Sequence, residues 1–389
     1  MIIHEVPAKS TRPRNRRDLI IAAASELFAE RGYGNVSMSD VARAVNVQPS
    51  ALYRHFAGKQ DLLREAIAQG ARLRREAVAL GHPAGLDEVL DDMARSTLDT
   101  RGSSQLWTSE VRNLDDETQR VLRREFRALP DAFAEKLAGI RPELEPAHAA
   151  LLAWAALDVL ASISFHSERL PRREFQVVLR EAMRRVVLLE LPPCTGRAPD
   201  SPDNVGSGSR RETVMRAAAE LFSRRGYSAV TLEDIGAEVG IAGASLYSYF
   251  SSKKELVSAL VVRTMEWQAY TAMVAVRGLS EPRERIGALV DAYVRFAFEE
   301  PAYLSLLLTE LPHLPEHQRT VIEQMLRDSV GMWVDLLRSL DPDRDPTVAR
   351  IQVEAARMIA LDVLQTPSLR GTPDLLRIVS AAALAALYV

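Results

Sequence analysis

The chain contains one stretch of sequence twice. Shifting the 389-residue sequence by 194 positions lays Arg17–Leu63 over Arg211–Val257 without a gap. Within this overlap AAASELFAERGYGNV faces RAAAELFSRRGYSAV, and SALYRHFAGKQDLL faces ASLYSYFSSKKELV. Self-similarity at a fixed offset indicates that one structural unit is built twice. A fold proposed for the first stretch must therefore also hold for the second.

Each repeated stretch begins with the pattern of an amphipathic helix. Apolar residues recur there at helical spacing. They are Ile20, Ala23, Ala24, Leu27 and Phe28 in the first stretch and Val214, Ala217, Ala218, Leu221 and Phe222 in the second. Gly32 and Gly226 follow as helix-ending residues. The sequence therefore predicts one helix ahead of each of these glycines.

Two shorter helices are predicted after each glycine. The first begins at Ser37 or Thr231, each with an Asp three residues later, which is the spacing of a capping box. The second covers Gln48–His55 or Ala242–Tyr249. Two short helices joined by a tight turn and supported by a longer helix form a helix-turn-helix. The last of them would enter the major groove of DNA.

A fourth helix is expected to begin at Lys59 and at Lys253. Ser252 and Glu255 have the spacing of a further capping box. Lysine in the first turn of a helix faces the positive end of the helix dipole, which costs about 0.3–1 kcal/mol. A phosphate bound at that end would reverse the sign. The two lysines are therefore candidate phosphate contacts, and a solvated helix end is the alternative.

Composition limits the remaining function classes. Hydrophobic residues make up 47% of the chain but aromatic residues only 6%, which favours helices. The net charge is −3, so DNA binding would depend on local basic patches. The single cysteine, Cys194, excludes an intrachain disulfide. We expect a cytoplasmic protein with no membrane partner, because neither a secretory pattern nor an apolar run of membrane-spanning length is present.

Enzyme and metal-site signatures are absent from the sequence. It holds no CxxC, HExxH, P-loop or GxSxG motif. We therefore expect no enzymatic activity, no catalytic residue, no cofactor and no bound metal.

The motifs LYRHF-x-x-K at Leu52–Lys59 and LYSYF-x-x-K at Leu246–Lys253 resemble the TetR/AcrR family of bacterial regulators. The resemblance is specific over about 47 residues in each half. A usual family chain is about half as long and acts as a dimer. Tandem members exist, including actinobacterial ones linked to lipid-import genes, and this chain is similar to that tandem subgroup.

The resemblance implies an all-α fold of two tandem units. Each would have an N-terminal helix-turn-helix domain and a C-terminal helical ligand-binding and dimerisation domain, packed as an intramolecular pseudo-dimer. The implied function is a DNA-binding transcriptional regulator, by family default a ligand-responsive repressor, whose partner is a double-stranded DNA operator. Five segments are expected: 10–63 (first DNA-binding domain), 64–190 (first regulatory domain), 191–209 (a Pro-, Gly- and Ser-rich linker), 210–257 (second DNA-binding domain) and 258–389 (second regulatory domain).

The resemblance also assigns DNA contacts residue by residue. Tyr53 and Tyr247 match a phosphate-touching tyrosine, and Lys59 and Lys253 match a phosphate-binding lysine. The expected contacts are Arg17, Ser37, Gln48, Ser50, Tyr53, Arg54, His55 and Lys59 in the first half, and Arg211, Thr231, Gly243, Ser245, Tyr247, Ser248, Tyr249 and Lys253 in the second. Gln48, Ser50 and Arg54 hold base-reading positions.

The regulatory domains are expected to be helical throughout. Their last two helices, at 146–166 and 172–189 and at 346–364 and 373–389, would form a four-helix interface within one chain. Aromatic residues that would meet an apolar, lipid-like effector, or else pack in the core, are Trp107, Phe133, Trp154, Phe165, Trp267, Tyr270, Tyr303 and Trp333. Asp158 and Asp362 lie in two copies of the string ALDVL. They either pair near the pseudo-twofold axis or face solvent.

The two halves differ in charge. Residues 9–64 carry ten basic and five acidic side chains, whereas residues 210–258 carry seven and six. The second recognition segment has no charged side chain between Ala242 and Phe250. We therefore expect one chain to read an asymmetric operator as a monomeric pseudo-dimer. The alternative is a sensor in which the second unit has lost DNA binding.

Overall fold

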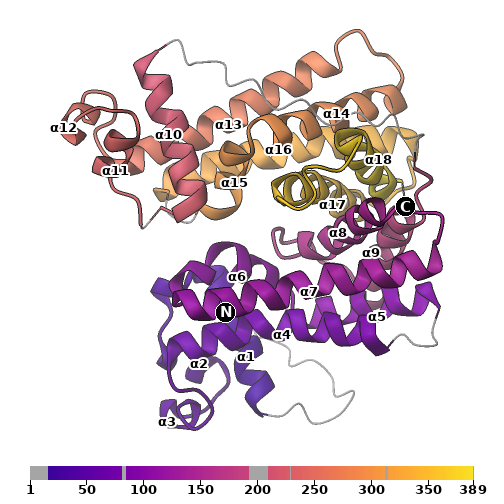
Figure 1. Ribbon diagram of the computed structural model, residues 1–389, viewed down its shortest axis with the longest axis horizontal. Coiled ribbons are helices and arrows are strands. Elements are labelled where there is room, and N and C mark those ends of the chain that lie inside the picture. The colour runs from indigo at the N-terminus through magenta and orange to yellow at the C-terminus, as the bar shows by residue number, and fades with distance from the viewer. Residues whose placement is uncertain (1–15, 81–84, 192–208, 228, 312–313, 389) are drawn as a thin grey trace.

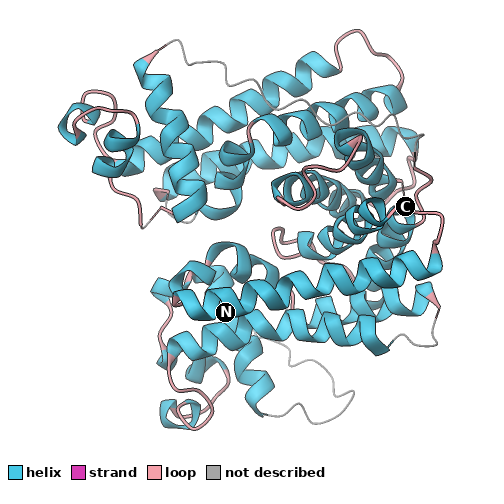
Figure 2. Cartoon of the chain, viewed as in Figure 1, coloured by secondary structure: helices cyan, strands magenta, loops and turns pink. Residues whose placement is uncertain are grey.

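The computed structural model describes residues 16–80, 85–191, 209–227, 229–311 and 314–388. All regular structure in these ranges is helical and no strand occurs in them, which confirms the all-α prediction (Figure 2). No helix in the same ranges is long and apolar enough to cross a membrane. The predicted linker at 191–209 lies almost entirely outside them.

The first unit follows a helix order that the second unit repeats (Figure 1). Its elements are α1 (Arg16–Arg31), η1 (Tyr33–Asn35), α2 (Met38–Ala44), α3 (Pro49–Leu52), α4 (Lys59–Leu80), α5 (Leu86–Asp99), α6 (Ser103–Ser109), η2 (Val111–Asn113), α7 (Asp116–Ile140), α8 (Pro146–Ser162) and α9 (Arg172–Val187). The second unit consists of α10 (Arg210–Arg225), α11 (Leu232–Glu238), α12 (Gly243–Leu246), α13 (Lys253–Ala275), α14 (Pro282–Glu299), α15 (Pro301–Thr309), α16 (Glu316–Leu340), α17 (Pro346–Gln365) and α18 (Leu375–Leu387).

The two units meet through the last two helices of each. Helices α8 and α9 pack against α17 and α18, so the predicted four-helix interface exists within one polypeptide. Figure 1 shows this interface on the right and the two helix-turn-helix domains on the left. Most of α8 is small or aliphatic, and Ala149, Leu152 and Ala156 on it are almost fully buried. Close approach of two such surfaces buries apolar area on both sides.

The two helix-turn-helix domains are joined to the body differently. Buried residues of the first domain, such as Phe28 and Leu52, form a hydrophobic cluster separate from the main core. Their counterparts Phe222 and Leu246 belong to the main core, which runs through both regulatory domains. The second domain is therefore packed continuously with the interface, whereas the cluster of the first extends only to nearby residues of the body, such as Leu106, Leu114 and Leu122.

Several predicted helix ends need correction. The third helices were expected to reach His55 and Tyr249, but α3 ends at Leu52 and α12 at Leu246. The next three residues form a turn, in which the His55 amide donates to the Leu52 carbonyl at 2.9 Å. Similarly, α8 ends at Ser162 instead of His166. There the Arg101 side chain donates to the carbonyls of Ile163 and His166, each at 2.7 Å, and replaces helical hydrogen bonds.

Asp158 and Asp362 lie side by side, with Asp158 buried and Asp362 half-buried, so the paired alternative holds and the solvent-facing one is wrong. Asp158 is 3% exposed and shares a side-chain hydrogen bond with Asp362. Burial, together with the charge of Asp362, raises the pKa of Asp158 well above its ordinary value of 3.8. Burial also raises the pKa of Asp362, while the bond from Asp158 opposes that rise. Burial therefore favours the neutral form of Asp158 more strongly than that of Asp362.

Replacing Asp158 by asparagine should stabilise the chain at neutral pH. When folding raises the pKa of a carboxyl group, the resulting stabilisation is complete at pH values below the pKa of that group in the unfolded chain. The stabilisation is lost as the pH rises through the pKa of the group in the folded chain. Asparagine keeps a donor for Asp362 but never ionises. Relative to the native chain, Asp158→Asn should gain about 1.4 kcal/mol at pH 8 for each unit by which the pKa of Asp158 is raised. It should gain little near pH 4.

Urea unfolding of both chains at pH 4, 6 and 8 measures this difference. The control is Asp131→Asn, which changes an exposed carboxylate on α7 and should show no such pH trend. A loss of stability at every pH in Asp158→Asn would contradict a protonated Asp158.

Candidate DNA-binding surface

The turn between the two short helices depends on left-handed backbone at equivalent positions. Asn46 has φ 52° and Gly240 has φ 69°. Asparagine and glycine are the residues that adopt this conformation at least cost. Each turn is closed by the following amide: Val47 donates to the Ala42 carbonyl and Ile241 to the Gly236 carbonyl, both at 2.9 Å. The sequence thus folds into a helix-turn-helix twice.

The predicted capping boxes fix the start of α2 and α11. The Asp40 amide donates to Ser37 Oγ at 3.2 Å, and the Ser37 amide donates to Asp40 Oδ2 at 2.9 Å. Hydrogen bonds from Ser37 lower the pKa of Asp40 to about 2. Thr231 and Asp234 repeat this geometry.

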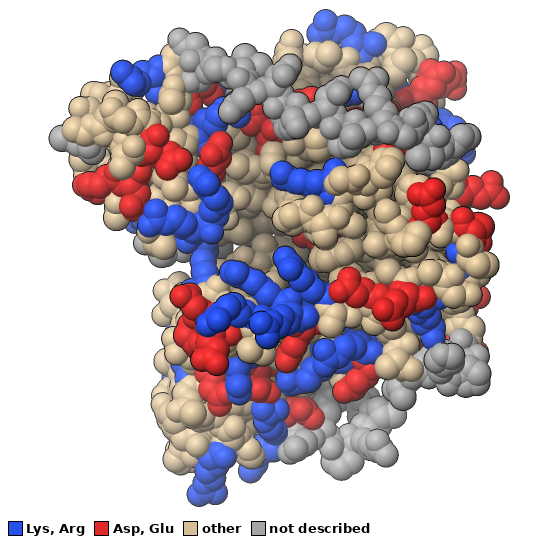
Figure 3. All heavy atoms as spheres, in the orientation of Figure 1, with Lys and Arg blue, Asp and Glu red and all other residues tan. Residues whose placement is uncertain are grey.

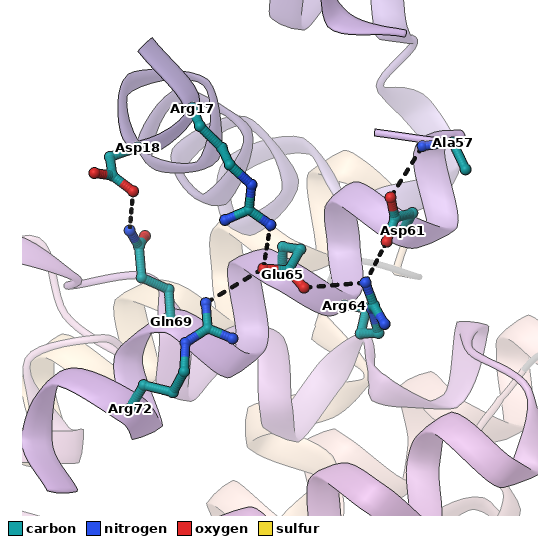
Figure 4. Close-up of polar contacts among 8 residues, drawn as sticks. All are labelled: Arg17, Asp18, Ala57, Asp61, Arg64, Glu65, Gln69 and Arg72. Atoms are coloured by element: carbon teal, nitrogen blue, oxygen red, sulfur yellow. Dashed lines mark hydrogen bonds and ion pairs between the residues drawn. The ribbon is translucent and has the colours of Figure 1, made fainter. Parts of the chain in front are cut away.

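A capping box predicted at α13 is only half formed. The Glu255 amide donates to Ser252 Oγ at 3.2 Å, as expected. The Glu255 carboxylate, however, accepts the Ser251 amide at 2.7 Å instead of the Ser252 amide. The first unit has the same arrangement, because the Ala57 amide donates to Asp61 Oδ2 at 2.9 Å (Figure 4). In both units the carboxylate therefore accepts from the amide of the residue before the N-cap, and not from the amide of the N-cap residue itself.

The structure sorts the predicted DNA contacts by exposure. The recognition segments α3 and α12 present exposed side chains, anchored from behind by the buried Leu52, Phe56, Leu246 and Phe250. Exposed members of the predicted set are Ser37, Gln48, Ser50, Tyr53, Arg54, His55, Arg211, Thr231, Ser245, Tyr247 and Ser248, and half-buried members are Arg17, Lys59, Tyr249 and Lys253. Gly243 is the first residue of α12.

Tyr53 and Tyr247 are 57% and 56% exposed at equivalent positions. A large aromatic side chain held in solvent twice at one position lies ready for a contact outside the chain. Arg54 is also exposed, and no hydrogen bond or ion pair holds its side chain among the described residues. These three side chains are therefore available for a contact outside the chain.

Arg17 is held by contacts inside the protein (Figure 4). Its Nη2 donates to Glu65 Oε2 at 2.6 Å, and its guanidinium lies 5.3 Å from the Phe56 ring centre. Burial alone would raise the pKa of Glu65, but the hydrogen bond and charge of Arg17 lower it. Arg64 and Arg72 reach the same carboxylate. The contact ties α1 to α4, the first helix of the body.

Arg211 lacks this anchor. The residue equivalent to Glu65 is Ala259, and the Arg211 guanidinium lies 4.6 Å from the Phe250 ring centre. The two arginines at the start of the DNA-binding domains therefore occupy different electrostatic surroundings.

The two lysines at the start of α4 and α13 turn towards the protein. Lys253 Nζ donates to the carbonyls of Tyr227 and Val230 at 2.7 and 2.8 Å, and lies 4.1 Å from the Tyr227 ring centre. Lys59 Nζ lies 4.1 Å from the ring centre of Tyr33. Burial lowers the pKa of both lysines, and a nearby glutamate opposes that shift. The ammonium groups thus hold the loop after α1 and after α10.

Replacing Lys253 by methionine should destabilise the chain by about 2 kcal/mol. Methionine keeps the aliphatic length but leaves two carbonyls without their charged donor. Urea unfolding without DNA measures the change. Lys254→Met is the matched control, because Lys254 is exposed and should alter stability by less than about 0.5 kcal/mol. Equal stability of the two variants would mean that Nζ of Lys253 does not bind the loop in solution.

A contact that sequence reasoning missed joins the first unit to the second unit, beside Gly226 of its helix-turn-helix domain. Arg112 Nη1 lies 3.2 Å from Oε1 of Glu310, which is fully buried. Gly226 ends α10 with φ 76°, and a Cβ there would lie 2.2 Å from Arg112 Nη1. In the first unit, Glu110 accepts the Tyr33 amide and lies near Gly32. Glu110–Leu114 resembles Glu310–Leu314 in sequence, and in that alignment the counterpart of Arg112 is Pro312, so the sequence supplies no equivalent arginine to the first domain.

The aromatic residues predicted to contact an effector fall into two groups in the structure. Trp107, Trp154 and Phe165 line a cavity of about 470 Å³. The other five do not line it. Phe133, Tyr303 and Trp333 are buried in the core, Trp267 packs on Tyr303, and Tyr270 is 62% exposed.

Comparisons with known proteins agree with two such domains. Residues 20–66 and 214–260 each match the model of the bacterial regulatory proteins of the tetR family. The HTH-type transcriptional repressor KstR2 of Mycolicibacterium smegmatis is 28% identical over 155 residues, which span 38% of this chain and 75% of KstR2. The HTH-type transcriptional activator FasR of the same organism is 34% identical, over 40% of this chain and 67% of FasR. The HTH-type transcriptional regulator BetI of Rhizobium meliloti is 30% identical, over 39% of this chain and 74% of BetI.

Proposed function

Because the chain belongs to the TetR family of bacterial regulatory proteins and so regulates transcription by binding DNA, we propose that it is a ligand-responsive repressor of an asymmetric operator. One polypeptide would cover the whole operator, with α3 on one half-site and α12 on the other. The exposed residues of these segments, with the helix starts around them, would make the DNA contacts. The site of action would be the cytoplasm.

The difference between the two recognition segments carries this proposal. The first exposes Gln48, Arg54 and His55, whose long side chains reach base edges and can donate or accept hydrogen bonds. The second exposes Ser245 and Ser248, which are short and uncharged. A homodimer presents two identical segments and reads a palindrome. This chain presents two different ones, so its half-sites should differ in sequence and in strength.

Ligand response is supported by the half-buried aromatic residues of the cavity between the units. Apolar clefts with a few polar groups are the usual sites for small molecules. We propose repression, and not activation, because KstR2, which is similar over three quarters of its length, is named a repressor. FasR is named an activator. A reporter gene behind the operator decides between these signs: expression should rise when the regulator gene is deleted.

Selection of bound fragments from random DNA tests the operator. The selected site should be asymmetric, with one strongly and one weakly specified half. Light scattering should show a free chain near its mass of 43.1 kDa and one chain per DNA site. A palindromic site that is bound by two chains would overturn the proposal. An asymmetric half-site bound by α3 alone would instead support a second unit without DNA-binding function.

A further inference from the structure

The cavity of about 470 Å³ lies between the two units. Its walls come from α4, α6, α7 and α8 of the first unit and from α10, α15 and α17 of the second. Figure 3 shows a hollow between the units, with Lys and Arg side chains gathered along the margin formed by the first unit. The volume falls within the range of about 300–1,000 Å³ that is typical of small-molecule sites.

One wall of the cavity is aromatic. Trp107 and Phe126 stack with ring centres 4.2 Å apart and planes 12° apart. Trp154 and Phe165 complete this wall from α8. All four side chains are half-buried, so part of each ring faces the cavity space. An apolar ligand would remove this remaining aromatic surface from water.

The charged lining has an excess of arginine. Arg74 is 5% exposed, and its only described hydrogen bond is the long one from Nη1 to Ser103 Oγ, at 3.5 Å. Burial lowers the pKa of Arg74 to about 10, so the guanidinium remains charged at neutral pH. No carboxylate pairs with it among the residues that the structure describes, and burial alone accounts for its pKa shift. A buried charge of this kind is costly until a partner compensates it.

Two further arginines extend the positive charge. Arg123 and Arg127 lie one turn apart on α7, line the cavity and make no ion pair within the described residues. The acids that line the cavity are Asp158 and Asp362, and burial raises the pKa of both carboxyls, which favours their neutral forms. Guanidinium groups bind carboxylates and phosphates through parallel hydrogen bonds, which suits an anionic ligand.

We infer that this cavity binds one amphipathic organic anion per chain. The apolar part of the ligand lies on the Trp107–Phe126 wall, and its acidic group lies on Arg74, Arg123 and Arg127. The inference rests on the proposed ligand response and names its ligand class: it replaces a purely apolar effector by one with an acidic group. It also places the ligand between the units.

The position of the cavity connects the ligand to the second DNA-binding domain. Ser223 of α10 lines the cavity and lies 3.0 Å from Ser305 of α15, measured between the Oγ atoms. The equivalent residue of α1 is Ala29, which does not line the cavity. An anion bound here therefore meets the first helix of the second domain and not that of the first. Regulation by the ligand should act mainly on the second half-site.

A matched pair of fluorescent probes tests the inference without DNA. 1-Anilinonaphthalene-8-sulfonate carries an acidic group on an aromatic framework, and N-phenyl-1-naphthylamine has the same framework without it. The sulfonate should bind one molecule per chain and about tenfold more tightly than the neutral probe. Arg127→Gln and Arg123→Gln should each remove most of that preference and leave the neutral probe unchanged. Arg124→Gln is the control, because Arg124 is exposed on α7 but does not line the cavity.

Equal affinity of the two probes, or equal loss in the Arg124 control, would overturn the inference. Hydrogen exchange gives a second readout: the bound sulfonate should slow exchange in α10 at least about threefold more than in α1. Equal slowing in both helices would overturn the link to the second domain. Because all arms omit DNA, a failure here leaves the DNA-binding proposal standing. A chain that binds the probe but no operator would overturn the DNA-binding proposal and leave the ligand inference standing.

Discussion

Replacing Arg54 by alanine should weaken binding to the selected operator by about 1–3 kcal/mol, or roughly 5- to 150-fold, with little change on random DNA. Arg54 is exposed on the first recognition segment and has no hydrogen bond or ion pair to lose within the described residues. Its removal therefore leaves the fold intact. The loss should be concentrated at the base pair that Arg54 contacts, so other base pairs of the operator should keep their preference.

The matched variant is Ser248→Ala, at the equivalent position of the second unit. Ser248 Oγ donates to the Ser245 carbonyl at 2.7 Å, which already occupies its one donor. We expect less than about a threefold change in operator affinity. Titration of both variants against the operator and against random DNA at one salt concentration gives the comparison. If Arg54→Ala lost the same affinity on both DNAs, Arg54 would be a phosphate contact only.

A DNA-cleaving tag at residue 16 should cut on one side of the operator only, and the same tag at residue 210 should cut on the other side. Arg16 and Arg210 are the first residues of α1 and α10 and are equivalent in the repeat. A homodimer carries each tag twice and cuts both sides. One chain in a fixed orientation carries each tag once.

The tags are attached through a cysteine at position 16 or 210 in a chain with Cys194→Ser, which removes the native thiol. All cleavage by one tag should lie on one side of the site centre, and the pattern should invert when the tag moves to the other position. Equal cutting on both sides by either tag would mean that two chains bind, each through one domain.

Local features of the fold could be predicted because they depend on neighbours in sequence. The capping boxes at Ser37 and Thr231 follow from a spacing of three residues. Gly32 and Gly226 end their helices because both have positive φ. Lys59 and Lys253 begin helices as predicted. In each case the determining contact lies within one turn of helix.

Features set by distant contacts were missed or left open. No local pattern shows that Lys253 Nζ turns to two carbonyls 23 and 26 residues away. The contact between Arg112 and Glu310 spans 198 residues. The two copies of ALDVL suggested that Asp158 and Asp362 are related, but only the packing of α8 on α17 decides that they pair. The cavity arginines were not singled out, because α4 and α7 meet only in the folded unit.

The interface between α8, α9, α17 and α18 has a consequence for gene dosage. A regulator that must first dimerise occupies its operator in proportion to the square of its concentration when it is scarce. In the proposed one-chain complex both halves are held together at the effective concentration set by the chain itself, so no association step would precede DNA binding. Occupancy would then fall in simple proportion when cell division dilutes the protein. A defective copy of the gene would also enter no mixed assembly in which it could inactivate the product of a sound one.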